Sequence, residues 1–583
     1  MPSDLLPPNW PALSIADANA ALAGPGSPVE LEDAVIRGVP MKVYKNAPPT
    51  IPAILDLANQ QFPERTYLVY QNERVTFGSL HLAVRRLAAE LRGRYGVQKG
   101  DRVAIIMRNY PQWPLAFYAA LSIGAIATPM NSWWTAEELE YGLSFAGVKL
   151  AICDSQIHER IRGRLDALPD LEHILIAREA TDDIADPRVS SLDAIVGDPN
   201  SWHSLADAGP PGVHLAPDDD ATIMYTSGTT GKPKGALATH RAVISNMFNS
   251  MTCQARMYLR KGEQVPAPDP DAMRATLLSI PFFHATGAFA VMIPSALRGD
   301  KIVAMYKWDA GEALPIIEAE KITTIGGVPA IAWQLLEHPD RDRYDLSTIA
   351  VISYGGAPSA PELVSTIKKR FPDAAPGNGW GMTETSATAT LNIGEDYVNR
   401  PSSAGAPPAA VELRICDPDG QDMAPGEVGE LWCKSPSNCR LYWNRPDATA
   451  ETFREGWVVT GDLARIDEEG FLYLVDRAKD MLIRGGENIY CIEVENALYD
   501  HPAVMDAAVV GIQHKVLGEE VGAVVQLKPG KSLTEAELRA HLAGNLAPFK
   551  VPVEVQFQSD PLPRNANGKI LKADLRQRFE PRG

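Results

Sequence analysis

Cysteine is scarce in this sequence, and its spacing is not that of a disulfide framework or a zinc site. Its six cysteines include no CxxC pair, and no histidine-rich spacing accompanies them, so it does not predict a Cys/His metal centre. The first residues, MPSDLLPPNWPALS, lack the basic start and apolar run of a secretion signal. Because unpaired cysteines persist in a reducing compartment, we expect a cytoplasmic protein.

Positive charge is also scarce. The chain carries 55 lysine and arginine residues against 73 aspartate and glutamate residues, a net charge of −18, which argues against nucleic acid or an anionic membrane surface as a partner. Two long uncharged runs, 114–136 and 275–297, are interrupted by proline and glycine. We interpret each as a buried helix joined to a buried strand and expect no membrane span.

The pattern of apolar residues predicts an α/β protein of more than one domain, since 583 residues are many for a single core. From Thr50 to about residue 400, apolar strands alternate with amphipathic helices, which predicts layered α/β structure with largely parallel strands. Short apolar runs between Gly, Pro and Asp turns over 401–470 predict an antiparallel β subdomain.

The residues after Asp476 are typical of a small α+β domain. They hold 14 basic and 14 acidic residues, so the whole excess of acid precedes Arg477. We therefore place a large N-terminal domain at 1–476, with 1–50 as an irregular extension, and a small, mobile C-terminal domain at 477–583.

Residues 225–235 read YTSGTTGKPKG and follow an apolar run. Hydroxyl, backbone N–H and ammonium groups are what a polyphosphate needs around it, although a surface turn can have the same composition. A P-loop is excluded, because Pro233 follows Gly231-Lys232 and Thr226 stands where the first glycine belongs. The stretch closely resembles the phosphate loop of the adenylate-forming (AMP-binding) superfamily.

Five further stretches follow the order of that superfamily, so the resemblance extends over nearly the whole chain from Thr50. They read PFFH at 281–284, YGGAP at 354–358, GWGMTE at 379–384, TGD at 460–462 and PRNANGK at 563–569. Taken singly, they have plainer interpretations: a core histidine, turns and a solvated lysine.

The resemblance implies a role for each matching residue. Lys569 would be the adenylation lysine, Thr383 would contact the α-phosphate, and His284 would line the acid site. Glu384 would bind Mg²⁺, with Thr226 as a further magnesium contact. The residues that would contact the phosphates are Thr226, Ser227, Gly228, Thr229, Thr230, Gly231, Lys232 and Lys234. Those that would lie near adenine and the acyl group are Gly355, Gly356, Ala357, Pro358, Trp380, Gly381 and Met382. Asp462 and Arg477 would contact the ribose. Asp480 would be the domain hinge, and Gly485-Gly486 would face the site during thioester formation.

The resemblance further implies the acyl-CoA synthetase branch, with ATP, Mg²⁺ and coenzyme A as cofactors. The enzyme would convert a carboxylic acid to an acyl-adenylate and then to its acyl-CoA. The stretch around His284 has no acidic residue to pair with an α-ammonium group, and the expected pocket walls are small or apolar: Ala285, Gly287, Ala288, Gly326, Gly327, Val328 and Ala330. A medium- or long-chain fatty acid is our first expectation. An aryl or arylalkanoic acid, a carrier protein as acyl acceptor and a non-catalytic ligand-binding homologue are alternatives, and the oligomeric state, with a homodimer among the options, stays open.

Overall fold

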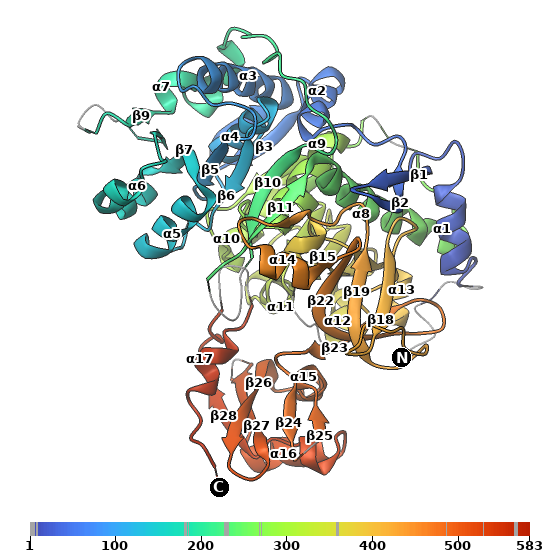
Figure 1. Ribbon diagram of the computed structural model, residues 1–583. Coiled ribbons are helices and arrows are strands. Elements are labelled where there is room, and N and C mark those ends of the chain that lie inside the picture. Colours follow the sequence, from blue (N-terminus) through green and yellow to red (C-terminus); the bar gives the residue numbers. More distant parts are fainter. Residues whose placement is uncertain are drawn as a thin grey trace.

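The computed structural model describes residues 6, 10–179, 184, 186–226, 232–267, 269, 271–356, 361–485, 487–528, 530–564 and 569–582. Figure 1 shows a large body, coloured blue to orange, and a smaller body below it that is formed by the C-terminal segment. In the described part of the chain, no helix combines the length and the apolar character that crossing a membrane requires.

Two eight-stranded sheets form the centre of the large body, and both are mainly parallel, as the alternating pattern predicts. The strands of the first are, in spatial order, β20 (Leu441–Tyr442), β11 (Gly235–Thr239), β10 (Asp220–Tyr225), β6 (Ile126–Pro129), β5 (Arg102–Ile106), β7 (Val148–Asp154), β8 (His173–Ala177) and β9 (Val189–Ser191). Those of the second are β17 (Thr390–Ile393), β16 (Ala375–Trp380), β15 (Val351–Gly355), β14 (Thr324–Gly327), β12 (Ala275–Leu278), β13 (Lys301–Ala304), β3 (Thr66–Tyr70) and β4 (Glu73–Thr76).

The helices form where the sequence supplies apolar faces and caps. The two uncharged runs are buried helix and strand, as predicted: α4 (Gln112–Ser122) leads to β6, and β12 leads through a π-helix (Thr286–Met292) to α9 (Ile293–Arg298). Helix α5 (Ala136–Ala146) begins at a capping box in which Thr135 accepts from the Glu138 N–H and Glu138 accepts from the Thr135 N–H.

The second sheet brings several of the predicted site residues to one of its edges. Strands β14, β15 and β16 run parallel, so their carboxyl ends, which lead into 328–331, Gly356 and 381–384, lie at the same edge. Ligands of open α/β sheets bind at such an edge.

The predicted antiparallel subdomain is confirmed. A five-stranded antiparallel sheet contains β18 (Glu412–Cys416), β19 (Gly429–Lys434), β22 (Trp457–Ile466), β21 (Phe453–Arg454) and β23 (Leu472–Arg477). Strand β23 then leads directly into the smaller body.

The smaller body has a sheet and a hydrophobic core of its own. Its strands are β24 (Leu482–Arg484), β25 (Glu487–Ile489), β26 (Val504–His514), β27 (Gly518–Leu527) and β28 (Glu554–Gln558), and its helices are α15 (Cys491–Tyr499), α16 (Glu535–Ala543) and α17 (Lys572–Arg576). It has the predicted α+β composition. We call 477–583 the small domain and keep the boundary at Arg477 as a proposal.

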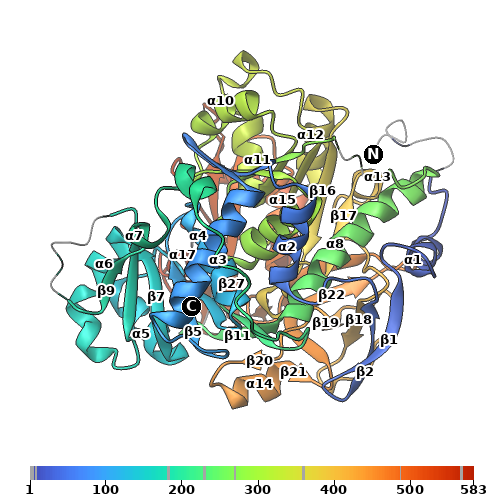
Figure 2. The ribbon, with the colours of Figure 1, turned by 90° about the horizontal axis from the view of Figure 1, so that it is seen from above.

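The expectation that 1–50 forms an irregular extension is wrong for its described residues. They include helix α1 (Ile15–Ala23) and the hairpin of β1 (Leu31–Ile36) and β2 (Val39–Tyr44). Ser14 caps α1 by accepting from the Asp17 N–H at 3.0 Å. Figure 2 shows α1 and the hairpin beside α8 (His240–Lys261) and the antiparallel sheet.

Candidate active site

The predicted phosphate loop is the connection of an antiparallel hairpin between β10 and β11, whose last pair is Tyr225 and Gly235. At its base the Thr226 N–H donates to the Lys234 carbonyl at 2.8 Å, and the Lys234 N–H donates to Thr226 Oγ1 at 3.4 Å. The predicted contacts Ser227, Gly228, Thr229, Thr230 and Gly231 lie outside the described residues.

Both lysines of this loop lie over aromatic rings. The Lys232 ammonium is 4.6 Å from the ring centroid of Tyr141, and the Lys234 ammonium is 4.7 Å from that of Tyr442. Cation–π contacts hold the two positive charges at the hairpin base, where they can attract phosphate groups.

Glu384, the predicted magnesium ligand, is only 6% exposed. The Tyr442 hydroxyl donates to its Oε1 at 2.5 Å. Burial and the Glu384 charge raise the pKa of the Tyr442 phenol, which keeps it a donor. Tyr442 lies on β20, which pairs with β11, so this side chain connects Glu384 to Lys234.

The protein supplies only some of the oxygen ligands that a magnesium ion needs at this site. Among the residues that the structure describes, no three His, Cys, Asp or Glu side chains are grouped so that they could hold a metal ion. Magnesium is often held by one or two protein oxygens together with phosphate oxygens of a substrate. The Glu384 carboxylate and the Thr226 hydroxyl fit that kind of site, which would need the nucleotide to complete it.

Trp380, Asp462 and Arg477 form one polar cluster. The indole N–H of Trp380 donates to Asp462 Oδ2 at 2.8 Å, and Arg477 Nε lies 3.2 Å from Asp462 Oδ1. Asp462 on β22 and Arg477 on β23 are direct partners in the sheet, so backbone register brings the predicted ribose contacts together. Asp462 is buried, and its contacts with Trp380 and Arg477 fix the orientation of its carboxylate.

Close backbone packing accounts for two of the predicted glycines. A Cβ atom on Gly355 would lie 2.6 Å from the Gly379 carbonyl oxygen, and one on Gly381 would collide with the carbonyl of Ala387. No larger residue fits at either position. The neighbouring Gly356 has a φ of +73°, which glycine adopts without strain, while Ala357 and Pro358 lie outside the described residues.

Lys569 reaches this cluster from the small domain. Desolvation and the Arg477 charge lower the pKa of its ammonium to about 8, against the opposite influence of the Asp462, Glu384 and Asp480 carboxylates. The three carboxylates that act on this pKa belong to residues that the resemblance assigns to the ribose, the metal and the hinge. The lysine is half-buried and protonated at neutral pH.

His284 is a neutral imidazole. Burial and the nearby Lys569 charge lower its pKa to about 4. The Thr286 N–H donates to His284 Nδ1 at 3.3 Å, so the ring proton belongs on Nε2. The side chain can therefore donate a hydrogen bond near Lys569 but does not contribute a positive charge.

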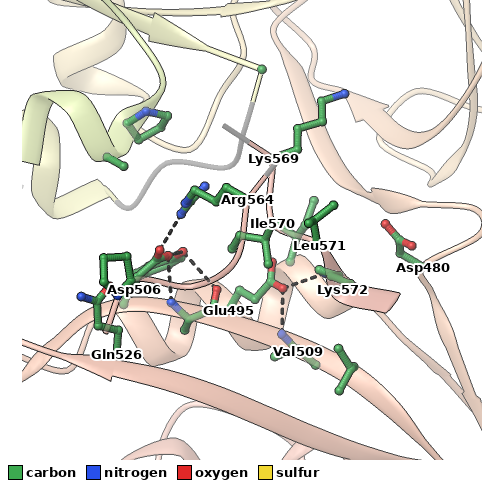
Figure 3. A pocket seen from close by; sticks show the side chains of 18 of the residues that line it. Asp480, Glu495, Asp506, Val509, Gln526, Arg564, Lys569, Ile570, Leu571 and Lys572 are labelled. Atoms are coloured by element: carbon green, nitrogen blue, oxygen red, sulfur yellow. Dashed lines mark hydrogen bonds and ion pairs between the residues drawn. The ribbon is translucent and has the colours of Figure 1, made fainter. Parts of the chain in front are cut away.

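A cavity of about 560 Å³ lies between the small domain and α11 (Pro329–Leu336), and Figure 3 views part of its lining. Lys569, Arg477, Asp480 and Gly356 line it. Gly485, in the turn between β24 and β25, does not line it, and Gly486 lies outside the described residues. Of the predicted site residues, Lys569, Arg477, Asp480 and Gly356 thus share this cavity, whereas Gly485 is not among its lining residues.

The small residues predicted as acid-pocket walls are packed more closely than expected. A Cβ on Gly287 would collide with the Pro281 carbonyl, and one on Gly327 would lie 2.6 Å from Ile331 Cδ1. Ala288 is fully buried, whereas Ala330 lines the cavity. The two glycines thus make room for neighbouring groups of the protein.

Comparison with known proteins gives a consistent result. The family model described as AMP-binding enzyme matches residues 55–443, and that of the AMP-binding enzyme C-terminal domain matches 493–569. Feruloyl-CoA synthase of an Amycolatopsis species is 34% identical over 521 residues, which cover 89% of this chain and 96% of that protein. Long-chain-fatty-acid–CoA ligase of Bacillus subtilis is 34% identical over 549 residues, covering 90% and 94%. The solved structure of O-succinylbenzoate coenzyme A synthetase from Bacillus subtilis, in complex with ATP and magnesium ion, is 29% identical with a TM-score of 0.73, covering 91% of this chain and 99% of that one.

Proposed function

Since the chain belongs to the AMP-binding enzyme family and is an AMP-forming acyl-CoA ligase, we propose that it activates a medium- or long-chain fatty acid with the residues described above. In the first half-reaction the acid's carboxylate oxygen attacks the α-phosphorus of ATP. The bond to the bridging oxygen of the β-phosphate breaks, pyrophosphate leaves, and an acyl-adenylate forms.

Lys569 carries the central role in this step. Its ammonium stabilises the negative charge that develops on the α-phosphate oxygens, and stabilisation of such charge is commonly the largest contribution to catalysis. Because its pKa is about 8, the lysine is charged at neutral pH. Thr383, beside Glu384, is proposed to donate its hydroxyl to the same phosphate.

The other polar residues hold the nucleotide. Asp462 accepts from the ribose hydroxyls while Trp380 and Arg477 fix its carboxylate. Lys232 and Lys234 neutralise phosphate charge from the hairpin. Glu384, oriented by Tyr442, and Thr226 would hold Mg²⁺, which supplies further charge neutralisation at the phosphate oxygens when bound.

The second half-reaction needs another position of the small domain. The coenzyme A thiolate attacks the acyl carbon, the bond to the AMP oxygen breaks, and AMP leaves. We propose that the small domain turns about Asp480, removes Lys569 and presents the Gly485 turn. Such domain motion lets one site serve two reactions in succession.

The choice of a fatty acid depends on one observation: no acidic or basic residue other than His284 lies between Phe282 and Leu297, and His284 is neutral. An amino-acid substrate would therefore bury its ammonium without a partner, which is costly. An apolar acid gains about 0.8 kcal/mol for each methylene that it buries.

An aryl or arylalkanoic acid is the second candidate, because one of the relatives at 34% identity is a feruloyl-CoA synthase and another a long-chain fatty acid–CoA ligase. A carrier protein in place of coenzyme A is a further alternative. Thioester assays with each thiol separate the two acceptors.

The experiment is a series of kcat/KM values for coenzyme A ligation across saturated acids, with phenylacetate, ferulate and phenylalanine alongside. We expect kcat/KM to rise about fourfold per carbon until the pocket is full, and phenylalanine to be inert. Acetate or ferulate as the best substrate, or turnover of phenylalanine, would contradict the fatty-acid assignment while leaving the ligase chemistry intact.

A further inference from the structure

The residues on either side of Lys569 are held to the small domain by two ion pairs (Figure 3), and the Glu495 carboxylate of one pair is buried. We propose that the pairs Lys572–Glu495 and Arg564–Asp506 position Lys569 for adenylate formation. This inference rests on the proposed role of Lys569. It adds positioning residues that lie outside the motifs of the active site.

The first anchor lies three residues after Lys569. Lys572 Nζ is 2.7 Å from Glu495 Oε1, and the Val509 N–H donates to the same oxygen at 2.9 Å. Glu495, on α15, is only 4% exposed. A carboxylate at such a site needs both partners, because a buried charge without its counterion is strongly destabilising. The pair therefore fixes the start of α17 against α15 and β26.

The second anchor lies five residues before Lys569. Arg564 Nη2 is 2.5 Å from Asp506 Oδ2, and the Tyr499 hydroxyl donates to Asp506 Oδ1 at 2.9 Å. An isolated antiparallel bridge joins Arg564 to Ile570. The two sides of the segment are thus held to each other as well as to the domain beneath.

The direction of the Lys569 side chain gives these anchors a catalytic consequence. In Figure 3 both pairs lie on the small-domain side of the cavity, and Lys569 extends away from them toward the large body. All four charged partners belong to the small domain, so they move with it. The lysine therefore enters the active site already oriented, and a displacement of about 1 Å at such a group can lower a rate about a hundredfold.

A second ion pair on the same helix, whose carboxylate is more exposed than that of Glu495, offers a control. Glu493, also on α15, pairs with Lys550 at 2.7 Å, and neither residue forms a hydrogen bond or ion pair with Arg564 or 569–572, the described residues around Lys569. Glu493→Gln removes an ion pair from the small domain without loosening Lys569. A loss of rate that is the same in Glu493→Gln and Glu495→Gln therefore reflects only the stability of the small domain.

The test compares the half-reactions in full-length enzyme. Glu495→Gln and Lys572→Met should each slow single-turnover adenylate formation by about ten- to a hundredfold. Thioester formation from supplied acyl-adenylate should stay within about twofold of the unchanged enzyme. Lys572→Arg should recover most of the lost rate, because it restores the charge pair. In Glu495→Gln, the pH above which the rate of adenylate formation falls should be higher than in the unchanged enzyme, because a loosened Lys569 is better solvated.

Each other outcome overturns the inference. Equal losses in both half-reactions, or no loss beyond that of Glu493→Gln, would show that the pairs only stabilise the domain. If Lys572→Met does not fold, the double variant Glu495→Gln/Lys572→Met, which buries no unpaired charge, is measured in its place by the same criteria. Lys569→Ala, assayed in parallel, separates the two levels: normal adenylate formation would refute the proposed role of Lys569 itself, whereas loss in Lys569→Ala with none in the anchor variants refutes only the anchoring.

Discussion

Trp380 and Asp462, 82 positions apart, meet through a hydrogen bond from the indole N–H to Oδ2 at 2.8 Å. The sequence predicts a flat ring beside adenine at Trp380 and a ribose acceptor at Asp462. The hydrogen bond joins the two roles, since the residue expected to contact the base also orients the carboxylate. Tyrosine or phenylalanine at this position would have no indole N–H.

Replacing Trp380 therefore tests orientation separately from stacking. Trp380→Phe keeps a flat ring and removes the donor. A hydrogen bond to a charged group contributes about 1.5–3 kcal/mol, and Arg477 still holds the carboxylate, so we expect KM for ATP to rise about tenfold with a smaller change in kcat. Trp113→Phe, which removes an indole N–H that has no partner within the described residues, controls for lost ring volume. An unchanged KM for ATP would refute the coupling.

Tyr442 offers a test of the metal site. Tyr442→Phe removes the hydroxyl that donates to Glu384 at 2.5 Å. Loss of a group that orients a metal ligand lowers metal affinity by about ten- to a hundredfold, so the Mg²⁺ concentration for half-maximal pyrophosphate release should rise accordingly. Excess Mg²⁺ should restore the rate. A loss that persists at saturating Mg²⁺ would assign Tyr442 another task.

The pH dependence of adenylate formation should reflect Lys569. The proposed active form is the ammonium, and the pKa is lowered to about 8. The single-turnover rate should therefore be level below that pH and fall about tenfold per unit above it. His284, with its pKa near 4, should contribute nothing between these limits. A rate that rises through pH 8 would show that the neutral amine is the active form.

Asp480 is open to a conformational test. Its N–H donates to the Arg477 carbonyl at 2.9 Å, and proline removes this donor while fixing φ. In Asp480→Pro we expect acyl-AMP still to form and to accumulate on the enzyme, since the turn to the thioester position is restricted. Asp480→Ala keeps the N–H and should behave normally. Unimpaired acyl-CoA production by Asp480→Pro would remove the hinge role.

Local patterns were enough to predict most of the fold. The pattern Thr-x-x-Glu at Thr135 and at Thr534 forms a capping box with both hydrogen bonds in each case. The mainly parallel sheets follow from the alternation of elements. The hairpin of β1 and β2 was missed because its turn, at Arg37-Gly38, is not among the common hairpin turn pairs. Strand β28 and helix α17 are five residues each and carry little periodicity.

The candidate site likewise contains residues that local sequence identifies and residues that it does not. Motif residues such as Glu384 and Asp462 are identified by their neighbours in the chain. Tyr442 is 58 positions from Glu384 and shows no local signal, because only the pairing of β20 with β11 brings it close. Glu495 was missed for the same reason, because its partner Lys572 lies 77 positions away in the chain, on α17.

The most direct test of the two-step account is the effect of Lys569→Ala on each half-reaction. Loss of one group that stabilises developing charge lowers a rate about 10²- to 10³-fold. We therefore predict that acid-dependent adenylate formation falls by at least that factor, while thioester formation from supplied acyl-adenylate and coenzyme A stays nearly unchanged. Equal losses in both half-reactions would contradict a site in which Lys569 serves the first step only.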